Sequence, residues 1–179
     1  MVDDDVTYVD RTLRGDKRAF ESLVEKYQKL VFNLAYNMTR NRDDAADVTQ
    51  SVFLKVYEKL YSFNRKFKFF SWMYRIALNE ALNVVQKQDR TKTLDEEIAS
   101  DARSPDGGLA VEDQTRSIQD AVLELEANYR VVIVLRHFQD LSYEDIATVL
   151  EIPEKTVKSR LFTARALLRT ICLRRGIIE

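Results

Sequence analysis

The stretch SFNRKFKFFSWMYRIALN, residues 62–79, holds the side chains whose types and spacing point most clearly to a chemical task. A buried strand would not hold its many charges, and a solvated loop would not expose so much aromatic surface. Aromatic rings stack on unpaired nucleic-acid bases, and Lys and Arg pair with the phosphates between them. We therefore predict a surface for unstacked nucleic acid, made by Phe63, Arg65, Phe67, Lys68, Phe69, Trp72, Tyr74 and Arg75.

Helical spacing extends this surface. Side chains recur at intervals of three and four, and so share one face of a helix, at Trp72, Arg75, Asn79 and Asn83. The amide groups of asparagine bond to base edges or to the backbone of nucleic acids. Core packing is the open alternative for Phe69, Phe70 and Trp72, because a small helical module needs aromatic side chains in its interior.

A second group of candidates lies in residues 141–169, LSYEDIATVLEIPEKTVKSRLFTARALLR. Ser142 followed by Asp145 is a helix-capping pattern, and Pro153 suits the start of a further helix directly after a tight turn. Two short helices joined in this way, the second of them basic, predict a helix-turn-helix whose second helix enters the major groove of DNA. Its candidates are Lys155, Thr156, Lys158, Ser159, Arg160, Phe162, Thr163 and Arg165.

The chemistry of these side chains divides them between base readout and phosphate contact. Groups that bond to base edges, or that suit a thymine methyl, belong to Lys158, Ser159, Phe162 and Thr163. Arg160 and Arg165 are placed to reach phosphates. An ordinary helical hairpin with a solvated face is the alternative, and an apolar Phe162 among basic residues counts against it.

The formal net charge of the 179 residues is −1, but the charges are segregated along the chain. Residues 65–92 hold seven basic side chains against two acidic ones, and residues 153–175 hold seven against one. Between them, residues 93–113 hold seven acidic side chains and a single Arg. This pattern favours two anion-binding regions joined by an acidic tether.

Several classes of protein are excluded by what the sequence lacks. No apolar run approaches the ~20 residues of a membrane span, and the acidic start MVDDDVTYVD does not fit a signal peptide. The lone Cys172 fits a reducing cytoplasm, and one His137 without a second cysteine argues against a zinc site. With neither a Gly-rich phosphate loop nor a nucleophile–base pair, we expect a cytoplasmic protein that is not an enzyme and needs no cofactor and no metal.

The expected fold is all-α. Gly and Pro are scarce, at four and two residues. Apolar positions recur at helical spacing in residues 20–38, 48–60, 71–88 and 118–125. The β-branched run in residues 130–138 is interpreted as a buried helix, because no partner strand is visible. We predict two small helical modules, residues 1–90 and 115–179, joined by a flexible acidic linker over residues 91–114, with the helix-turn-helix in the second module.

Three motifs in this order resemble the extracytoplasmic-function class of bacterial sigma factors, which keeps only the second and fourth conserved regions of the family. Asp47-Val-Thr-Gln50 with Phe53 resembles the helix that binds core polymerase. FSWMYRIALNEALN resembles the promoter-melting helix, and the helix-turn-helix resembles the module that reads the minus-35 element. The resemblance implies a protein that directs core RNA polymerase to specific promoters and initiates transcription.

The resemblance also implies roles for individual residues. The polymerase clamp, a coiled coil of the largest subunit, would be contacted by Asp47, Gln50, Ser51 and Phe53. Residues 63–69 would hold a flipped base of the melted minus-10 element, which Arg75, Asn79 and Asn83 would also touch. The implied partners are core RNA polymerase, through its clamp and flap, promoter DNA and an anti-sigma factor. Ser51 and Thr163 depart from the usual Glu and Arg, so the strength of one polymerase contact and the minus-35 preference are expected to differ.

Three other functions fit parts of the pattern. A stand-alone helix-turn-helix regulator with a helical N-terminal domain shares the second module but explains neither the Asp47–Gln50 motif nor the basic-aromatic stretch. A small helical enzyme lacks catalytic groups. An adaptor that works through protein contacts alone leaves the DNA-facing residues without a role.

Overall fold

The computed structural model describes residues 4–95 and 110–179, and the side chains of residues 4–88 and 116–179. This part of the chain is helical and contains no strand, which confirms the all-α prediction. The N-terminal module consists of α1 (Asp4–Leu13), α2 (Lys17–Thr39), α3 (Arg42–Lys59), the short 3-10 helix η1 (Leu60–Ser62) and α4 (Phe69–Asp95). The C-terminal module consists of α5 (Ala110–Leu123), α6 (Ala127–Ile133), the π-helical turn η2 (Val134–Phe138), α7 (Tyr143–Leu150) and α8 (Glu154–Arg174).

Short polar side chains cap the starts of α2, α3 and α7. Asp16 and Asn41 cap α2 and α3 by accepting hydrogen bonds from backbone N–H groups of the first turn. The Ser142 hydroxyl does the same for α7 at 3.0 Å. The turn of the helix-turn-helix is made by Glu151, whose backbone is left-handed with φ at 53°, and by Pro153 directly before α8. The predicted tight turn is therefore confirmed.

The β-branched run, which closes α6 and enters η2, is helical, as interpreted from the sequence. Val131, Val132, Ile133 and Val134 are all buried, so packing on several sides outweighs their preference for strands. The chain passes directly from α6 into the π-helical turn η2, a local widening that the sequence did not predict.

The boundaries of the predicted linker differ from expectation. α4 was expected to end near residue 88, but it continues to Asp95, and α5 already begins at Ala110. The stretch QKQDRTKTLD that closes α4 is rich in good helix formers, which explains the longer helix. Residues 96–109 of the predicted linker lie outside the described residues.

α1 was not predicted. It packs across α2, and Asp5 makes the connection, since this 4 % exposed side chain accepts hydrogen bonds from the Tyr27 hydroxyl and the Lys26 ammonium group at 2.5 Å each. Among its apolar side chains only Val9 is fully buried, which leaves little periodic signal in the sequence.

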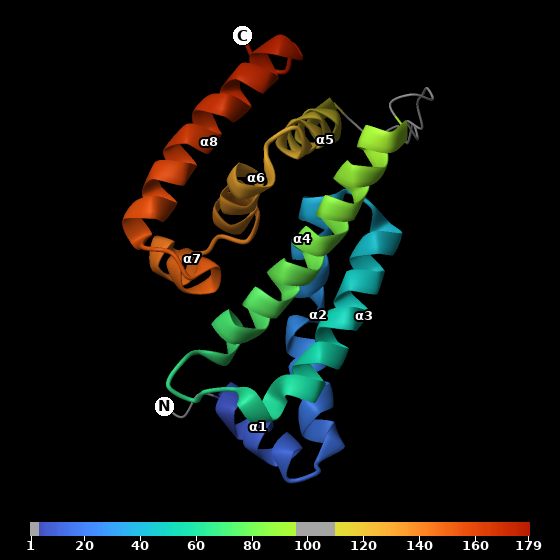
Figure 1. Cartoon of the computed structure of the whole chain (residues 1–179), viewed down its shortest axis with the longest axis vertical. Coiled ribbons are helices and arrows are strands. Elements are labelled where there is room, and N and C mark those ends of the chain that lie inside the picture. The colour runs from blue at the N-terminus through green and yellow to red at the C-terminus, as the bar shows by residue number, and fades with distance from the viewer. Residues whose placement is uncertain (1–3, 96–109) are drawn as a thin grey trace.

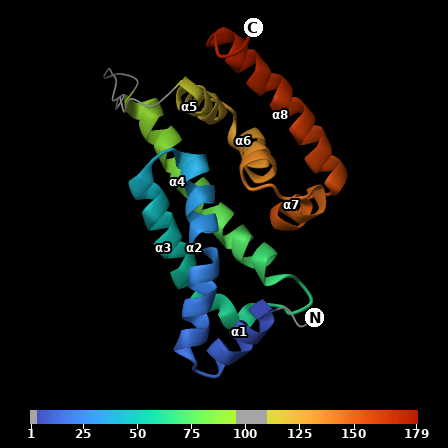
Figure 2. The same cartoon turned by 180° about the vertical axis from the view of Figure 1, so that it is seen from behind.

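The C-terminal module packs on both α4 and α2, since α7 contacts α4 while η2 and α5 contact α2. α2 and α3 lie along one side of α4 and α6 and α7 along the other, with α8 at the outer edge (Figures 1 and 2). Buried side chains of both modules form one continuous apolar cluster. Within the described part, no helix has the length and apolar character that crossing a membrane requires. Because α4 contacts α2, α3 and α7, the candidate sites are arranged around it.

Candidate nucleic-acid and polymerase interfaces

The loop between η1 and α4 forms the rim of a hollow of about 490 Å³. Side chains of the basic-aromatic stretch line it, with the Phe67 ring 58 % exposed and Trp72 half-buried beside Arg75. Exposed ring faces next to a guanidinium suit a splayed base and its phosphate. The geometry is therefore compatible with the predicted capture of unpaired DNA.

Three of the predicted DNA contacts are buried, although one of them, Phe63, also lines the hollow. Phe63, Phe69 and Tyr74 are 4 %, 0 % and 1 % exposed. The Phe63 and Phe69 rings meet edge to face with centroids 5.5 Å apart, and both contact Trp72. Phe69 therefore packs in the core, which was the alternative to a contact with nucleic acid. Phe63 and Phe69 hold Trp72 in position from beneath.

Phe69→Ala is expected to lower the free energy of unfolding by about 3–5 kcal/mol, the usual cost of truncating a buried Phe. Phe67→Ala is the matched control, since its ring is 58 % exposed and its loss is expected to change stability by no more than ~0.5 kcal/mol. Chemical denaturation followed by circular dichroism measures both. Equal effects of the two substitutions would contradict the division into a supporting ring and a free ring.

Three basic residues of the stretch pair with acidic groups outside it. Arg65 Nε donates to Asp10 Oδ1 of α1 at 2.9 Å. Lys68 Nζ lies 3.1 Å from Asp145 Oδ1 of α7, and Arg75 forms an ion pair with Glu151 at the end of α7. The cations predicted to contact phosphates are thus already in contact with carboxylates of the same chain.

Asn79 and Asn83 are both exposed, as the spacing predicts, but they line different hollows. Asn79 borders a hollow of about 220 Å³ between the two modules, which it shares with Arg160. Asn83 borders a polar cleft of about 450 Å³ between α3 and α4. The predicted face of α4 therefore continues past the loop hollow toward α3.

The second helix of the helix-turn-helix, α8, has a buried inner face and an exposed outer face. Val157, Leu161 and Ala164 are buried, whereas the outer face exposes Lys155, Lys158, Ser159, Phe162 and Thr163. Phe162 is 78 % exposed, an unusual position for a ring without a partner to contact. The outer face therefore presents an apolar ring among hydrogen-bonding side chains.

Several side chains of α8 are held by near neighbours. Lys158 Nζ lies 2.6 Å from Glu154 Oε1 and 5.7 Å from the centre of the Tyr143 ring. Ser159 Oγ donates to the backbone oxygen of the half-buried Thr156 at 3.0 Å. These contacts hold the Lys158 and Ser159 side chains in place.

The two arginines predicted to reach phosphates differ in environment. Arg160 is half-buried beside the hollow that contains Asn79. Arg165 is exposed, and its Nε donates to His137 Nε2 at 3.3 Å. Partial burial, together with Arg165 and Arg136, lowers the pKa of His137, so the imidazole is neutral near pH 7. The neutral imidazole accepts the hydrogen bond from Arg165 without adding a second positive charge beside it.

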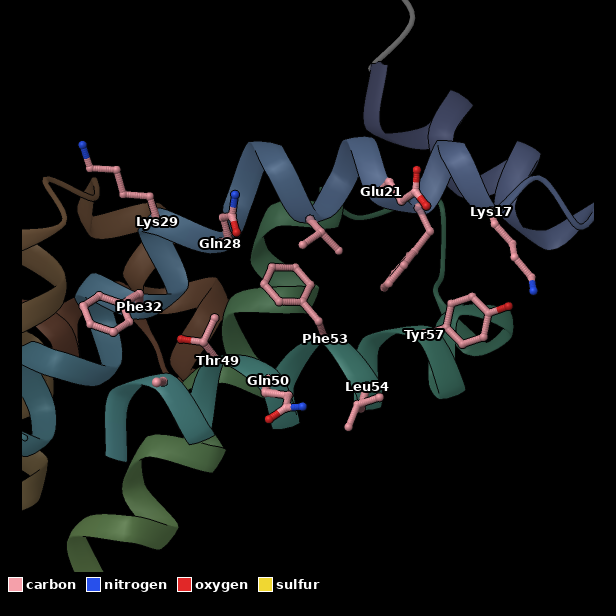
Figure 3. Close-up of a pocket in the computed structure, with 13 residues that line it drawn as sticks. Lys17, Glu21, Gln28, Lys29, Phe32, Thr49, Gln50, Phe53, Leu54 and Tyr57 are labelled. Atoms are coloured by element: carbon pink, nitrogen blue, oxygen red, sulfur yellow. The ribbon is translucent and has the colours of Figure 1, made fainter. Parts of the chain in front are cut away.

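A groove with a volume of about 980 Å³ lies between α2 and α3. Figure 3 shows the Phe53 and Tyr57 rings on α3 and the Lys17 and Glu21 side chains on α2 along this groove. Of the predicted polymerase contacts, Gln50 and Phe53 line it. An apolar floor with a polar edge is typical of a protein-binding surface.

The other two predicted polymerase contacts, Asp47 and Ser51, lie on the opposite side of α3, in the polar cleft toward α4. Ser51 Oγ donates to Glu80 Oε2 at 2.9 Å, and Lys55 Nζ lies 2.6 Å from Glu80 Oε1. Burial alone would raise the pKa of Glu80, but the bonds from Lys55 and Ser51 outweigh it and lower this pKa. The predicted set is thus divided between two surfaces of one helix.

The sequence prediction omitted two exposed apolar side chains of the groove. Leu54 is 59 % and Tyr57 50 % exposed, and the Tyr57 ring meets Phe20 of α2 edge to face at 4.9 Å. Both lie outside the buried apolar stripe of α3, on a face where a solvent-exposed helix would carry polar residues. Apolar residues outside the buried stripe are the sequence signal by which Leu54 and Tyr57 could have been identified.

The described residues contain no group of three or more His, Cys, Asp or Glu side chains that could hold a metal ion.

Comparison with known families matches both modules. Residues 23–91 match the model of Sigma-70 region 2, and residues 115–168 match Sigma-70, region 4. These matches include α3 and most of α4 in the first module and α7 with most of α8 in the second.

Similar proteins extend the match over most of the chain. RNA polymerase sigma-H factor of Pseudomonas aeruginosa is 36 % identical over 173 residues, 90 % of each chain, and ECF RNA polymerase sigma-E factor of Haemophilus influenzae is 36 % identical over 178 residues, 92 % of this chain and 93 % of that one. The sigma factor RpoE of Bartonella quintana, solved in complex with the anti-sigma factor NepR, is 26 % identical with a TM-score of 0.66 over 85 % of this chain and 95 % of that one. CnrH, solved with the cytosolic domain of CnrY, shares the fold at 24 % identity, with a TM-score of 0.73 over 94 % of this chain and 97 % of that one. The chain therefore belongs to the extracytoplasmic-function RNA polymerase sigma factors, which direct core RNA polymerase to specific promoters.

Proposed function

We propose a division of labour between the two modules of this sigma factor. Residues 1–90 bind core polymerase and hold melted minus-10 DNA, residues 115–179 read the minus-35 duplex, and residues 91–114 join them. The observation that carries the proposal is the outer face of α8, where Phe162 is 78 % exposed beside Lys158, Ser159 and Thr163 on the second helix of a helix-turn-helix.

Readout of the minus-35 element is assigned to the outer face of α8. Lys158 and Ser159 donate to base edges, Phe162 contacts a thymine methyl, and the other contacts come from Lys155, Thr156, Thr163 and the two arginines Arg160 and Arg165. The neutral His137 beside Arg165 supports phosphate contact by that arginine.

The variants Lys158→Ala and Ser159→Ala are expected to change which minus-35 sequences are used, at ~1–3 kcal/mol for each lost base contact. Arg165→Ala is the matched control on the same helix. It should weaken binding about equally on all sequences and reduce the salt dependence, because a phosphate contact carries no sequence information. Selection from a randomised minus-35 library, followed by sequencing, measures the preference. The same uniform loss in all three variants would contradict direct readout.

The melted minus-10 strand is assigned to a surface that we call the melted-strand surface, defined as Arg65, Phe67, Lys68, Trp72, Arg75, Asn79 and Asn83. Exposed rings at the loop hollow stack on splayed bases, at roughly 1–3 kcal/mol for each base. Phe63, Phe69 and Tyr74 support it from the core.

Core polymerase is assigned to the α2–α3 groove, where Gln50 and Phe53 lie with Leu54 and Tyr57. Asp47 and Ser51 extend the contact around the edge of α3. In this function the chain supplies no catalytic group, because polymerase adds the nucleotides, and it works in the cytoplasm with polymerase. An anti-sigma factor is a further proposed partner, supported by the complex of the Bartonella protein.

Run-off transcription with purified core polymerase tests the whole assignment. The chain should confer start-site-specific transcripts on core enzyme. A regulator of the stand-alone type would instead bind promoter DNA without polymerase and yield none.

A further inference from the structure

The first turn of α8 carries an acidic side chain, Glu154, that lies outside the set of predicted DNA contacts. Glu154 is the first residue of the helix, and its side chain is 46 % exposed. Its Oε1 lies 2.6 Å from Nζ of Lys158, one helical turn further on. In a helix-turn-helix, the N-terminal residues of the second helix are those that contact base edges. Glu154 is therefore placed where side chains of this helix meet DNA.

Glu154 is the one acidic residue of α8, against six basic residues on the same helix. A carboxylate that faces the major groove loses hydration and is repelled by the phosphates. Both costs are offset when the carboxylate accepts a hydrogen bond from a base. The donors that the major groove offers are the amino groups of cytosine N4 and adenine N6. An acidic group at this position thus suits an amino group of a base.

Tyr143, the first residue of α7, holds the partner of Glu154 in place. α7 lies next to the start of α8, as both views show (Figures 1 and 2). The centre of the half-buried Tyr143 ring lies 5.7 Å from Lys158 Nζ and 5.4 Å from Cζ of Arg136. Attraction of the ammonium group to the ring, together with its ion pair to Glu154, restricts where Lys158 points. Glu154 and Lys158 therefore present an acceptor and a donor side by side.

An acceptor beside a donor complements the edge of one G·C base pair. In the major groove guanine presents two acceptors, N7 and O6, and the paired cytosine presents its N4 donor next to them. The ammonium group of Lys158 can donate to both guanine acceptors while Glu154 accepts from cytosine. In a T·A pair the ammonium group finds one acceptor, thymine O4, beside a methyl group.

The carboxylate also distinguishes the two orientations of the pair. In the reversed pair, C·G, Lys158 meets the cytosine amino group and Glu154 meets guanine O6. Donor then faces donor and acceptor faces acceptor. Lys158 thus selects G·C over T·A, and Glu154 selects G·C over C·G.

We infer that Glu154 is a specificity-determining residue, which reads one G·C pair of the minus-35 element together with Lys158. Lys158 binds the guanine and Glu154 the cytosine, while the Tyr143 ring positions Lys158. The inference rests on the proposed readout by the outer face of α8 and adds to it an acidic contact and the identity of one base pair.

The test uses holoenzyme assembled from core polymerase and the full chain, with a promoter library randomised in the upstream block and sequencing of the transcripts. The base pair read by Lys158 is the one whose preference Lys158→Ala alters, and the unsubstituted chain should prefer G·C there. Glu154→Ala should lower the preference for G·C over C·G at this same position about tenfold, the lower range of discrimination by one base contact. Glu154→Gln keeps an acceptor oxygen and should retain part of the preference.

Glu144→Ala is the matched control, because it removes the same charge from the first turn of the other helix of the helix-turn-helix, at an exposed position. It should leave every base preference unchanged. If Glu154→Ala has the same lack of effect while the unsubstituted chain shows its upstream block, the inference is overturned and Glu154 serves only the helix start.

Two further results would also overturn the inference. Glu154→Ala could alter a different position from Lys158→Ala, or the shared position could prefer a pair other than G·C. Failure of the proposed function is recognised separately, because the unsubstituted chain would then show no upstream preference, and the inference would fail with it.

Discussion

Replacement of both Asn79 and Asn83 by alanine is expected to reduce promoter opening about 100-fold. Each amide that contacts a base contributes ~1–3 kcal/mol, and both side chains are exposed, so the substitutions remove contacts without disturbing the core. Assembly with core polymerase and binding to a duplex minus-35 fragment should be retained, because neither asparagine lines the α2–α3 groove or belongs to the outer face of α8.

Permanganate reactivity of unpaired thymines reports opening directly. A template already mismatched across the minus-10 element is the control, and it should restore part of the activity because the cost of unstacking, a few kcal/mol, has been removed. Normal reactivity of the double variant on fully duplex promoter DNA would show that this face of α4 does not hold the melted strand.

The asparagines are a cleaner choice than Trp72 for this experiment. The Trp72 ring packs on the buried Phe63 and Phe69 rings, at centroid distances of 5.5 Å and 5.8 Å. Its truncation would loosen the core as well as remove a stacking surface.

Tyr57→Ala is expected to weaken holoenzyme formation about 30-fold, since a central aromatic side chain at a protein interface commonly contributes ~2 kcal/mol or more. Tyr57 is 50 % exposed and lines the α2–α3 groove (Figure 3). Leu54→Ala should add to the loss. Fluorescence anisotropy of labelled protein titrated with core polymerase measures the affinity.

Tyr61→Ala provides the matched control, because this 79 % exposed tyrosine lies on η1 outside the groove. It should bind polymerase normally. If Tyr57→Ala also binds normally while Asp47→Ala does not, polymerase contacts the polar side of α3 and the groove has another use.

Helix faces and caps were predictable from the sequence because they depend on local spacing. Asp16, Asn41 and Ser142 are short polar side chains before apolar periodic runs, and each caps the helix that follows it. The inner and outer faces of α8 likewise follow from a period of 3.6 residues.

Whether an individual aromatic ring is buried or exposed was not predictable in this way. Phe67 and Phe69 are two residues apart in one basic-aromatic stretch, yet one ring is 58 % exposed and the other is fully buried. The difference arises because Phe69 begins α4 and faces Tyr27 of α2, a tertiary contact that spacing does not reveal. The division of Gln50 and Ser51 between two surfaces has the same origin, because it depends on where α2 and α4 pack against α3.

The contacts between the two modules were also not predictable from the sequence. Glu151 and Arg75 are separated by 76 positions, and single acidic and basic residues on exposed faces do not specify their partners. Only the placement of α7 against α4 brings the acidic groups to the predicted DNA-binding cations.

Transcription from a randomised promoter library by purified core polymerase, with and without this protein, tests the central claim most directly. With the protein, the transcribed templates should share two sequence blocks at a fixed spacing, and Lys158→Ala should alter the upstream block alone. Transcripts that require the protein but share no upstream block, or an absence of transcripts above core enzyme alone, would contradict the account.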